Sequence, residues 1–387
     1  MVVRLLGAVV LLFAAFAAAP ASADITTTAE HAILMDGDTG EVLWAKDAYS
    51  PMPPASMSKL MTLELLFQRL KDGRMKLTDT LPISERAWRE RAGSECFVPI
   101  GARMQVETLI RCVIVASGND SCIALAEGMG GTVEGFVDMM NRRAKEIGLK
   151  HSHFVNPDGL PQPPGQLMSA IDLATLARHL IRDYPQYYHY FSEREIEVSN
   201  IKQQNRNLVL DKFPGADGLK TGHTDAAGYG LTASAVRNGQ RLILVLNGLR
   251  YPAGTSDWFA ERYRADEAAR VLDLAFREFR RYTLFKPGDK VADAEVFAGA
   301  APTAPLTVQR PVSFTMQVDS RPGLKVSVHY VGPLRAPLAQ GQQVATLDIT
   351  APDFPGLHVP LVVAQPVDEV GIFGRFVIGL KALFGSR

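Results

Sequence analysis

Short apolar runs beside turn signals predict strands in two parts of the chain. Ala32–Met35 and the residues around Leu43 flank an Asp-Gly turn, and Leu231–Ala235 and Leu242–Leu246 flank an Asn-Gly turn, as in hairpins. Elsewhere, apolar residues recur three and four positions apart, which is typical of amphipathic helices. The mixture predicts a domain of helices and strands over residues 24–283. The predicted helices cover Leu60–Leu70, Val106–Ala116 and Ala265–Phe279.

The pattern changes after Tyr282. Alternate residues from Phe314 to Val318 and from Leu324 to Tyr330 are apolar, and Pro and Gly separate such runs. A period of two with turn residues between the runs predicts strands. We therefore expect a small β-rich domain over residues 284–366.

The last segment, residues 367–387, predicts an amphipathic helix. Its apolar residues share one broad face, and Arg375 and Lys381 lie outside that face. The segment is too short and too charged to span a bilayer, but it suits the membrane interface. We expect it to lie on a membrane surface; a helix packed on the β-rich domain is the alternative. The apolar residues are Ile372, Phe373, Phe376, Val377, Leu380, Leu383 and Phe384.

The length of 387 residues exceeds what one core usually supports, which agrees with several domains. Net charge is zero and no basic block is present, so nothing favours nucleic acid as a partner. A basic start and the apolar run Leu5–Ala19 precede the small residues Ala21-Ser22-Ala23. This pattern predicts a secretory signal peptide, residues 1–23, cut before Asp24. An uncleaved membrane anchor is the weaker alternative, because a spanning helix needs about 20 apolar residues.

The three cysteines, Cys96, Cys112 and Cys122, cannot all pair within the chain, because their number is odd. Their spacing predicts no disulfide framework, and no cluster of Cys and His has the spacing of metal ligands. Cys112 and Cys122 lie in apolar helical stretches. We expect both to be buried thiols that act as small hydrophobic groups. No metal or organic cofactor is implied.

Ser56 and Lys59 form the first candidate motif. A hydroxyl becomes a good nucleophile only when a base removes its proton. Pro53-Pro54 ends the preceding extended chain, so we expect a helix to begin near Ser56, with both side chains on one face. The positive end of the helix dipole and burial together favour a neutral lysine, which is a base. Alone, the motif is weak, because Ser56 is explained almost as well as a helix N-cap.

Two further motifs carry polar side chains beside glycine. In Ser117-Gly118-Asn119 the serine can relay a proton and the amide can hold a carbonyl, although a turn with a helix cap explains this motif better by itself. Lys220-Thr221-Gly222-His223-Thr224 precedes the strand at Leu231, so we expect it on an edge strand. There Gly222 leaves room for a ligand, and Lys220 and Thr221 can bind a carboxylate. A solvated, charged edge is the alternative.

Taken together, the three motifs resemble a known set. A Ser-x-x-Lys, a Ser-x-Asn and a Lys-Thr-Gly in this order are the signature of penicillin-binding proteins and serine β-lactamases. Longer segments resemble the low-molecular-mass D-alanyl-D-alanine carboxypeptidases of the penicillin-binding protein 5 and 6 type, serine peptidase family S11. The resemblance covers nearly the whole mature chain. The similar segments are Pro54–Thr62, Ser117–Cys122, Phe154–Leu160, Gly218–Thr224 and, in the β-rich domain, Ala336–Gln342.

The resemblance implies an α/β (α+β) fold: a β-lactamase-like catalytic domain with an antiparallel sheet packed by helices, a small all-β domain and a terminal helix. It implies that Ser56 is acylated, that Lys59 is its base, and that Ser117 and Asn119 complete the proton relay and the grip on substrate. Backbone N–H groups of Ser56 and His223 would form the oxyanion hole. The implied substrate-binding residues are Lys220, Thr221, Gly222, His223, Thr224, Arg206 and Arg264.

The two arginines are the weaker matches. Arg206, within Asn205-Arg206-Asn207, is similar to a family arginine near the site. Arg264 is similar to a second one, but the preceding segment Tyr251–Arg262 is longer than is usual for the family. A surface ion pair is the alternative for both.

The implied reaction is acyl transfer in two steps. Ser56 displaces the terminal D-alanine of a peptidoglycan stem peptide, and water then hydrolyses the acyl-enzyme. β-Lactam antibiotics would be covalent inhibitors, and the protein would act in the periplasm, on the outer face of the inner membrane. A β-lactamase is one alternative, although no Glu-x-x-x-Asn lies between Asn119 and Lys220. A non-catalytic cell-wall module and an endopeptidase are the others.

Overall fold

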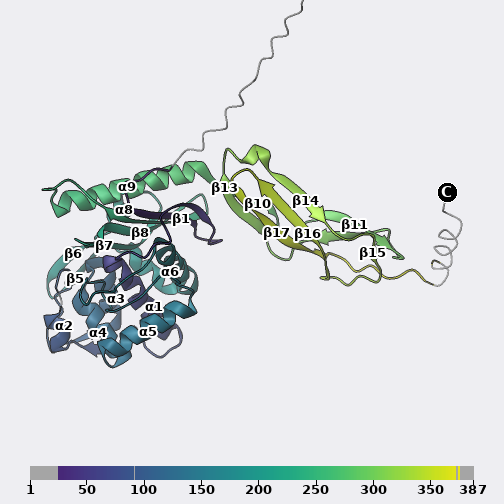
Figure 1. Cartoon of the computed structure of the whole chain (residues 1–387). Coiled ribbons are helices and arrows are strands. Elements are labelled where there is room, and N and C mark those ends of the chain that lie inside the picture. Colours follow the sequence, from purple (N-terminus) through teal and green to yellow (C-terminus); the bar gives the residue numbers. More distant parts are fainter. Residues whose placement is uncertain (1–24, 91, 372–373, 375–387) are drawn as a thin grey trace, which may run out of the picture.

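The computed structural model describes residues 25–90, 92–371 and 374. The predicted signal peptide, residues 1–23, lies outside the described residues, and so does most of the predicted helix 367–387, namely residues 372–373 and 375–387. The described chain forms a domain of helices and strands followed by an elongated domain of strands (Figure 1). Among the described residues, no helix combines the length and the apolar character needed to cross a bilayer.

The first domain contains a five-stranded antiparallel sheet in the order β2-β1-β9-β8-β7. The Asn-Gly turn at Asn238 joins β8 to β9, as predicted. The strand that carries Lys220 lies at the edge of the sheet, which confirms the sequence expectation. The strands are β1 (His31–Asp36), β2 (Val42–Lys46), β7 (Ala216–Thr224), β8 (Gly228–Arg237) and β9 (Gln240–Leu249).

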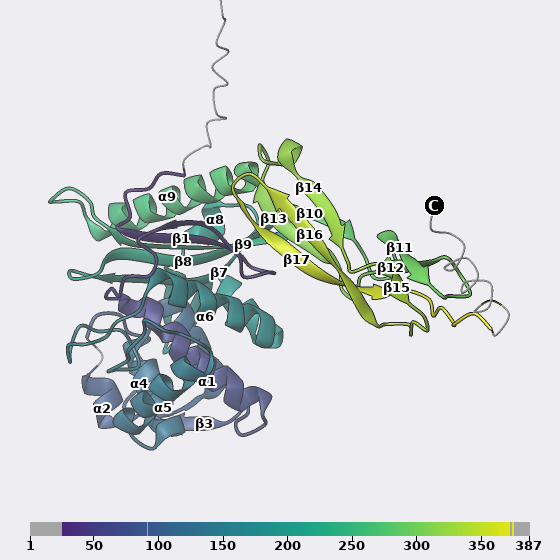
Figure 2. The same ribbon diagram turned by 45° about the vertical axis from the view of Figure 1, so that its right-hand side comes forward.

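Helices cover both faces of this sheet because its central strands are apolar on both sides. Leu244 and Leu246 join the core that lies against α9, whereas Ile243 and Val245 join the core shared with α1, α4 and α6. Figures 1 and 2 show α9 along one face and the remaining larger helices against the other. The larger helices are α1 (Lys59–Lys71), α4 (Asn119–Gly130), α5 (Val133–Glu146), α6 (Ala170–Asp183) and α9 (Asp257–Glu278).

Two predicted helices differ from the observed ones. The predicted helix Val106–Ala116 is α3 (Val106–Arg111) followed by a π-helical turn, Cys112–Ala116. The predicted helix Ala265–Phe279 begins earlier, at Asp257. Its first turns carry the exposed aromatic residues Trp258 and Phe259, so the apolar spacing that marks a buried face fails there.

Shorter elements complete the first domain. Two small antiparallel sheets of two strands each, β3–β4 and the hairpin β5–β6, lie outside the main sheet. Their strands are β3 (Thr80–Pro82), β4 (Arg103–Gln105), β5 (Glu195–Val198) and β6 (Ile201–Gln204). The short helices are α2 (Glu85–Arg89), α7 (Pro185–Tyr188) and α8 (Val209–Lys212).

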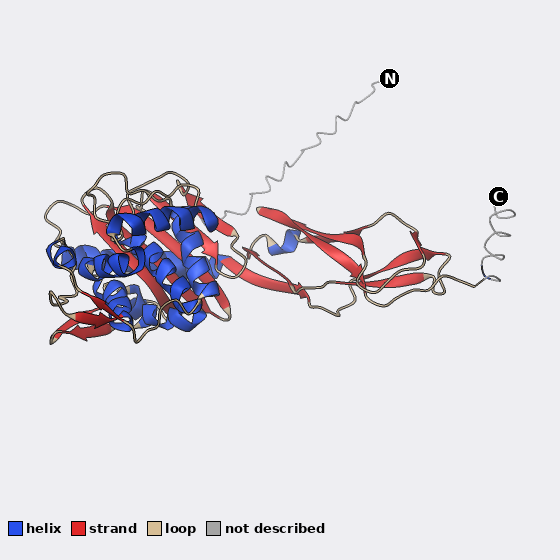
Figure 3. Cartoon of the chain, turned by 90° about the horizontal axis from the view of Figure 1, so that it is seen from below, coloured by secondary structure: helices blue, strands red, loops and turns tan. Residues whose placement is uncertain are grey.

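The second domain is built almost entirely of strands, as Figure 3 shows and as the alternating pattern predicts. Its sheets have the orders β10-β13 and β14-β16-β17-β12-β11-β15. Leu347, Ile349 and Leu361 are fully buried in its core. The strands are β10 (Phe279–Phe285), β11 (Ala292–Phe297), β12 (Thr303–Thr307), β13 (Val312–Gln317), β14 (Lys325–His329), β15 (Leu334–Arg335), β16 (Gln343–Ala351) and β17 (Phe354–Val363).

The two domains meet where α9 runs directly into β10. Arg281 of β10 forms an ion pair with Asp38 in the turn after β1. Thr315 of β13 donates its hydroxyl to the buried carboxylate of Asp36. The predicted domain limit after Thr283 falls inside β10, and all the predicted domain limits stay predictions.

Candidate active site

Ser56 lies in a 3₁₀ turn, Ala55–Ser58, that leads into α1 at Lys59. The residue before it, Ala55, has a left-handed backbone with φ 47°, which is uncommon for a residue other than glycine. The N-cap of α1 is Ser58, and no side chain caps the helix. The helix-cap explanation of Ser56 therefore fails in this structure.

Lys59 connects Ser56 to a neighbouring loop. Its Nζ donates to Ser56 Oγ at 2.7 Å and to the main-chain oxygen of Asp158 at 2.6 Å. The side chain is fully buried. Burial lowers the pKa of Lys59, the charge of Arg206 adds to this effect, and the carboxylate of Asp158 opposes it. A buried amine with a lowered pKa in contact with a hydroxyl is suited to accept its proton.

A second serine–lysine contact lies beside the first. Ser117 ends the π-helical turn in a left-handed conformation, φ 61°, and its hydroxyl accepts a hydrogen bond from Lys220 Nζ at 3.0 Å. Lys220 is 1% exposed. Burial, followed by the charge of Lys59, holds the pKa of Lys220 well below its usual range. The fold therefore places two buried lysines, each on a serine hydroxyl, in one site.

Asn119 begins α4 and bonds to the preceding loop. Its main-chain N–H donates to Ser94 O at 2.8 Å, and its side-chain Nδ2 donates to Ala92 O. Its Oδ1 is buried and accepts no hydrogen bond from any described residue. The structure thus brings Asn119 to the site, and its predicted contact with a substrate carbonyl stays a prediction.

Strand β7 passes close to the turn that carries Ser56 because Gly222 has no side chain. A Cβ on Gly222 would lie 3.0 Å from Pro54 O and 3.1 Å from both Ala55 Cβ and Ser56 N. This approach forms one side of a cavity of about 250 Å³. The cavity is lined by Ser56, Gly93, Ser94, Ser117, Arg206, Thr221, Gly222, His223, Tyr229, Asp257, Glu261 and Arg264.

Most of the predicted site residues therefore meet at this cavity. Lys59 and Lys220 contact it through the serines they bond. Asn119 does not line it, but bonds to the segment that carries Gly93 and Ser94. Thr224 does not line it either, because it lies at the end of β7 and lines a neighbouring cavity. Its hydroxyl accepts from Ala227 N at 3.1 Å, so its predicted role in binding stays untested.

Both arginines point toward backbone oxygens at the site. Arg206 Nε donates to Ala116 O at 3.2 Å, and Arg264 donates to Gly222 O and Arg206 O at 3.4 and 3.3 Å. Arg264 is 2% exposed, and neither arginine has an ion-pair partner among the described residues. The surface ion pair is therefore excluded for Arg264, and two arginines line the cavity together with the acidic residues Asp257 and Glu261.

Several residues at the site carry no signal in a single sequence. Asp158 acts through its main-chain oxygen, which every residue possesses. Tyr229 stacks on His223 with ring centroids 3.8 Å apart and donates its hydroxyl to Asp257. Burial lowers the pKa of His223. Glu261 lines the cavity one helical turn before Arg264.

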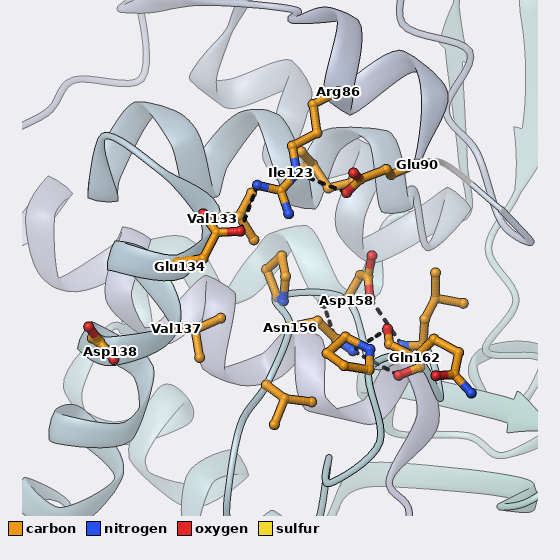
Figure 4. A pocket seen from close by; sticks show the side chains of 14 residues that line it. Arg86, Glu90, Ile123, Val133, Glu134, Val137, Asp138, Asn156, Asp158 and Gln162 are labelled. Carbon is orange, nitrogen blue, oxygen red and sulfur yellow. Dashed lines mark hydrogen bonds and ion pairs between the residues drawn. The ribbon is translucent and has the colours of Figure 1, made fainter.

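A larger cavity, about 580 Å³, lies beyond the loop that contains Asp158 (Figure 4). Arg86 lines it and forms ion pairs with Glu90 at 2.9 Å and Glu134 at 2.8 Å. Figure 4 shows the side chain of Arg86 between the carboxylates of Glu134 and Glu90. The described residues that line it include no serine, cysteine or lysine, whereas the smaller cavity contains the serine bonded to a lysine. Among the described residues, no group of His, Cys, Asp and Glu side chains suits a metal ion.

The cysteine prediction was partly wrong. Cys96 and Cys112 form a disulfide, with Cα atoms 5.4 Å apart, so Cys112 is not a free thiol. The pair was not predicted because Cys96 lies in an irregular segment, which comes next to the π-helical turn only when the chain has folded. Cys122 is a buried free thiol, as predicted, and burial raises its pKa to about 12.

A serine in contact with a buried lysine of lowered pKa, beside an edge strand and a cavity lined by arginines, defines the class of serine enzymes that transfer acyl groups. Comparison with known proteins identifies the family. Residues 16–249 match the family model of D-alanyl-D-alanine carboxypeptidases, peptidase S11, and residues 279–369 match that of the penicillin-binding protein 5 C-terminal domain. The chain belongs to the D-alanyl-D-alanine carboxypeptidase family S11.

Individual relatives extend over both domains. The chain is 36% identical to D-alanyl-D-alanine carboxypeptidase DacA of Escherichia coli K12, over 92% of this chain and 88% of the relative. It is 34% identical to DacA of Haemophilus influenzae, over 92% and 91% of the two chains. The crystal structure of penicillin-binding protein 5 from H. influenzae has a TM-score of 0.77 at 33% identity and covers 89% of this chain and 98% of that one. The predicted fold, catalytic domain plus β domain, is thereby confirmed.

Proposed function

We propose that this protein is a serine-type carboxypeptidase that removes the terminal D-alanine from peptidoglycan stem pentapeptides through an acyl-enzyme on Ser56. The observation that carries the proposal is the 2.7 Å contact between Lys59 Nζ and Ser56 Oγ, made by a buried lysine whose pKa is lowered. Family membership supports the same activity. The assignment of each residue below is part of the proposal.

In the first step Lys59 removes the proton from Ser56 as Oγ attacks the carbonyl carbon of the penultimate D-alanine. The developing oxyanion is held by the main-chain N–H groups of Ser56 and His223, which lie on the two sides of the close approach at Gly222. Ser117, bonded to Lys220, passes the proton that Lys59 took from Ser56 to the leaving nitrogen, which leaves Lys59 neutral again. Loss of D-alanine leaves an ester on Ser56, and Lys59 then activates the water that hydrolyses it.

The substrate carboxylate is held beside the two arginines of the cavity. Thr221, Arg206 and Arg264 line the cavity, and Lys220 reaches it through its bond to Ser117. A buried guanidinium binds a carboxylate more strongly than an exposed one, because water competes less. This arrangement selects peptides with a free C-terminal carboxylate, and it equally suits the carboxylate of a β-lactam, which would acylate Ser56 in the same way.

The test is direct. After incubation with penicillin, mass spectrometry of a digest should show one covalent adduct, on the Ser56 peptide, and Ser56→Ala should show none. A folded protein without an adduct would favour a non-catalytic cell-wall module. Rapid turnover of nitrocefin would favour a β-lactamase. Release of D-alanine from pentapeptide, compared with cleavage of a cross-linked dimer, separates carboxypeptidase from endopeptidase action.

We further propose that the protein is exported to the periplasm and lies on the outer face of the inner membrane through residues 367–387. The amphipathic sequence of that segment supports this placement. So does the hydrogen bond from Val370 N to Ala298 O, because Ala298 follows β11, at the end of the second domain that is farther from the first (Figure 1). A truncation at residue 366 should no longer sediment with anionic lipid vesicles, whereas the full mature chain should. Equal sedimentation of both would exclude this anchor.

A further inference from the structure

The disulfide Cys96–Cys112 joins two segments that build the active site. Cys112 begins the π-helical turn that ends at Ser117. Cys96 follows Gly93 and Ser94, which line the cavity beside Ser56. We propose that this disulfide is a positioning element for catalysis, which holds the segment 92–98 against the Ser117-Gly118-Asn119 motif. The inference rests on the proposed function, because it concerns the rate of acylation at the same site.

Hydrogen bonds show how the motif depends on this segment. Asn119 donates its main-chain N–H to Ser94 O and its side-chain amide to Ala92 O. In the other direction, the N–H groups of Cys96 and Val98 donate to the carboxylate of Asp120, at 3.0 to 3.2 Å. Asp120 is fully buried. Both residues after Gly118 are therefore oriented by the segment that the disulfide holds.

The two segments are also in close contact at Gly118. A Cβ there would lie 3.0 Å from Cys96 Cβ and 3.2 Å from Cys96 N. A side chain at position 118 would thus push the two segments apart. The fold needs this short separation, because only then do both oxygens of Asp120 reach Cys96 N.

Besides the disulfide, hydrogen bonds to Asn119 and Asp120 hold the segment 92–98. Of its residues, Cys96 and Val98 are buried, whereas Ala92, Gly93 and Phe97 are exposed. Exposed or half-buried contacts with the β5–β6 hairpin add to its attachment: Ser199 donates to Phe97 O and Gln203 donates to Glu95 O. The covalent link to Cys112 adds to these contacts and fixes the distance between Cys96 and the π-helical turn.

Loss of the disulfide should disturb the Ser117-Gly118-Asn119 motif and leave the Ser56–Lys59 pair unchanged. Reduction by a dithiol supplies two electrons and two protons, breaks the S–S bond, and gives two thiols and an oxidised dithiol. The reduced segment is then free to leave Asn119, which lowers the rate of acylation. Lys59 lies on α1, and burial is the largest influence on its pKa, whereas the charge of Asp120 contributes less than burial, Cys122, Asp158 and Arg206. The pH midpoint of acylation should therefore stay where it is.

The experiment compares oxidised and dithiothreitol-reduced protein, full mature chain, with the Cys96→Ser/Cys112→Ser double variant. We expect reduction to lower kcat/KM for pentapeptide by about tenfold or more, since small displacements of positioning groups have effects of this size. The double variant should resemble the reduced protein and should not respond to dithiothreitol. It serves as the control for other effects of the reductant.

Three further measurements test whether the loss of rate comes from displacement of the segment 92–98. Near-UV circular dichroism must stay native, the pH midpoint must not move, and reoxidation must restore the rate. A reduced protein, shown by mass to carry the two new thiols, that keeps kcat/KM within about twofold overturns the proposal. So does a loss of rate that comes with unfolding or with a moved midpoint. If the double variant does not fold, reduction of the native wild type still gives the answer. If the oxidised protein is not acylated at all, the proposed function has failed rather than this inference.

Discussion

Gly159 offers a sharp test of how the site is assembled. It has φ +86°, and a Cβ there would lie 2.0 Å from the main-chain oxygen of Ala55. Real Cβ contacts stay beyond 3.0 Å, so Gly159→Ala must separate the loop from the turn that carries Ser56 by about 1 Å, a misplacement that can cost about a hundredfold in rate. The same loop supplies Asp158 O to Lys59. We expect acylation by a fluorescent penicillin to fall by about that factor.

The matched control is Gly148→Ala. Gly148 has φ +80°, and a Cβ at this position would have no other atom within 4 Å, so the substitution carries only the left-handed backbone cost of about 1–2 kcal/mol. Thermal unfolding of both variants then separates this shared cost from the clash. If Gly159→Ala is folded and acylates within about threefold of Gly148→Ala, the close approach does not position Ser56 and the reasoning is refuted.

Three further predictions concern charge. Acylation should rise with pH as Lys59 loses its proton, with a midpoint below the usual lysine value of 10.5 because burial lowers its pKa; a midpoint at or above 10.5 would contradict Lys59 as the base. Burial and, next, the charge of Asp36 raise the pKa of Glu41 from 4.5 to about 7, so the folded state takes up a proton and loses stability as pH rises across that window. Glu41→Gln should therefore have a higher Tm than wild type at pH 8 and an equal Tm at pH 4. A variant whose Tm exceeds that of wild type at pH 4 but not at pH 8 would contradict this direction. Arg264→Gln should raise KM for a peptide with a free carboxylate by about tenfold and leave its C-terminal amide unaffected; equal effects on both peptides would count against carboxylate binding.

The sequence predicts the fold well where local signals are strong. The Asp-Gly and Asn-Gly turns mark the two hairpins of the main sheet, and α1 has the expected apolar spacing. The start of α9 was missed because its first turns bear exposed aromatic residues, Trp258 and Phe259, which do not follow a buried face. The π-helical turn before Ser117 has no local signal either.

For the site, the sequence by itself determines which side chains are available: two serines, two lysines, an amide and the glycines that permit close approach. Side-chain identity is a local property, so the motifs can be read directly. What only the tertiary structure decides is the environment of those groups. It buries Lys59 and Lys220, which lowers their pKa values. It also brings Asp158 O to Lys59 and Cys96 to Cys112. A main-chain oxygen is alike at every residue, and a disulfide partner is chosen by distance, so neither is determined until the chain has folded.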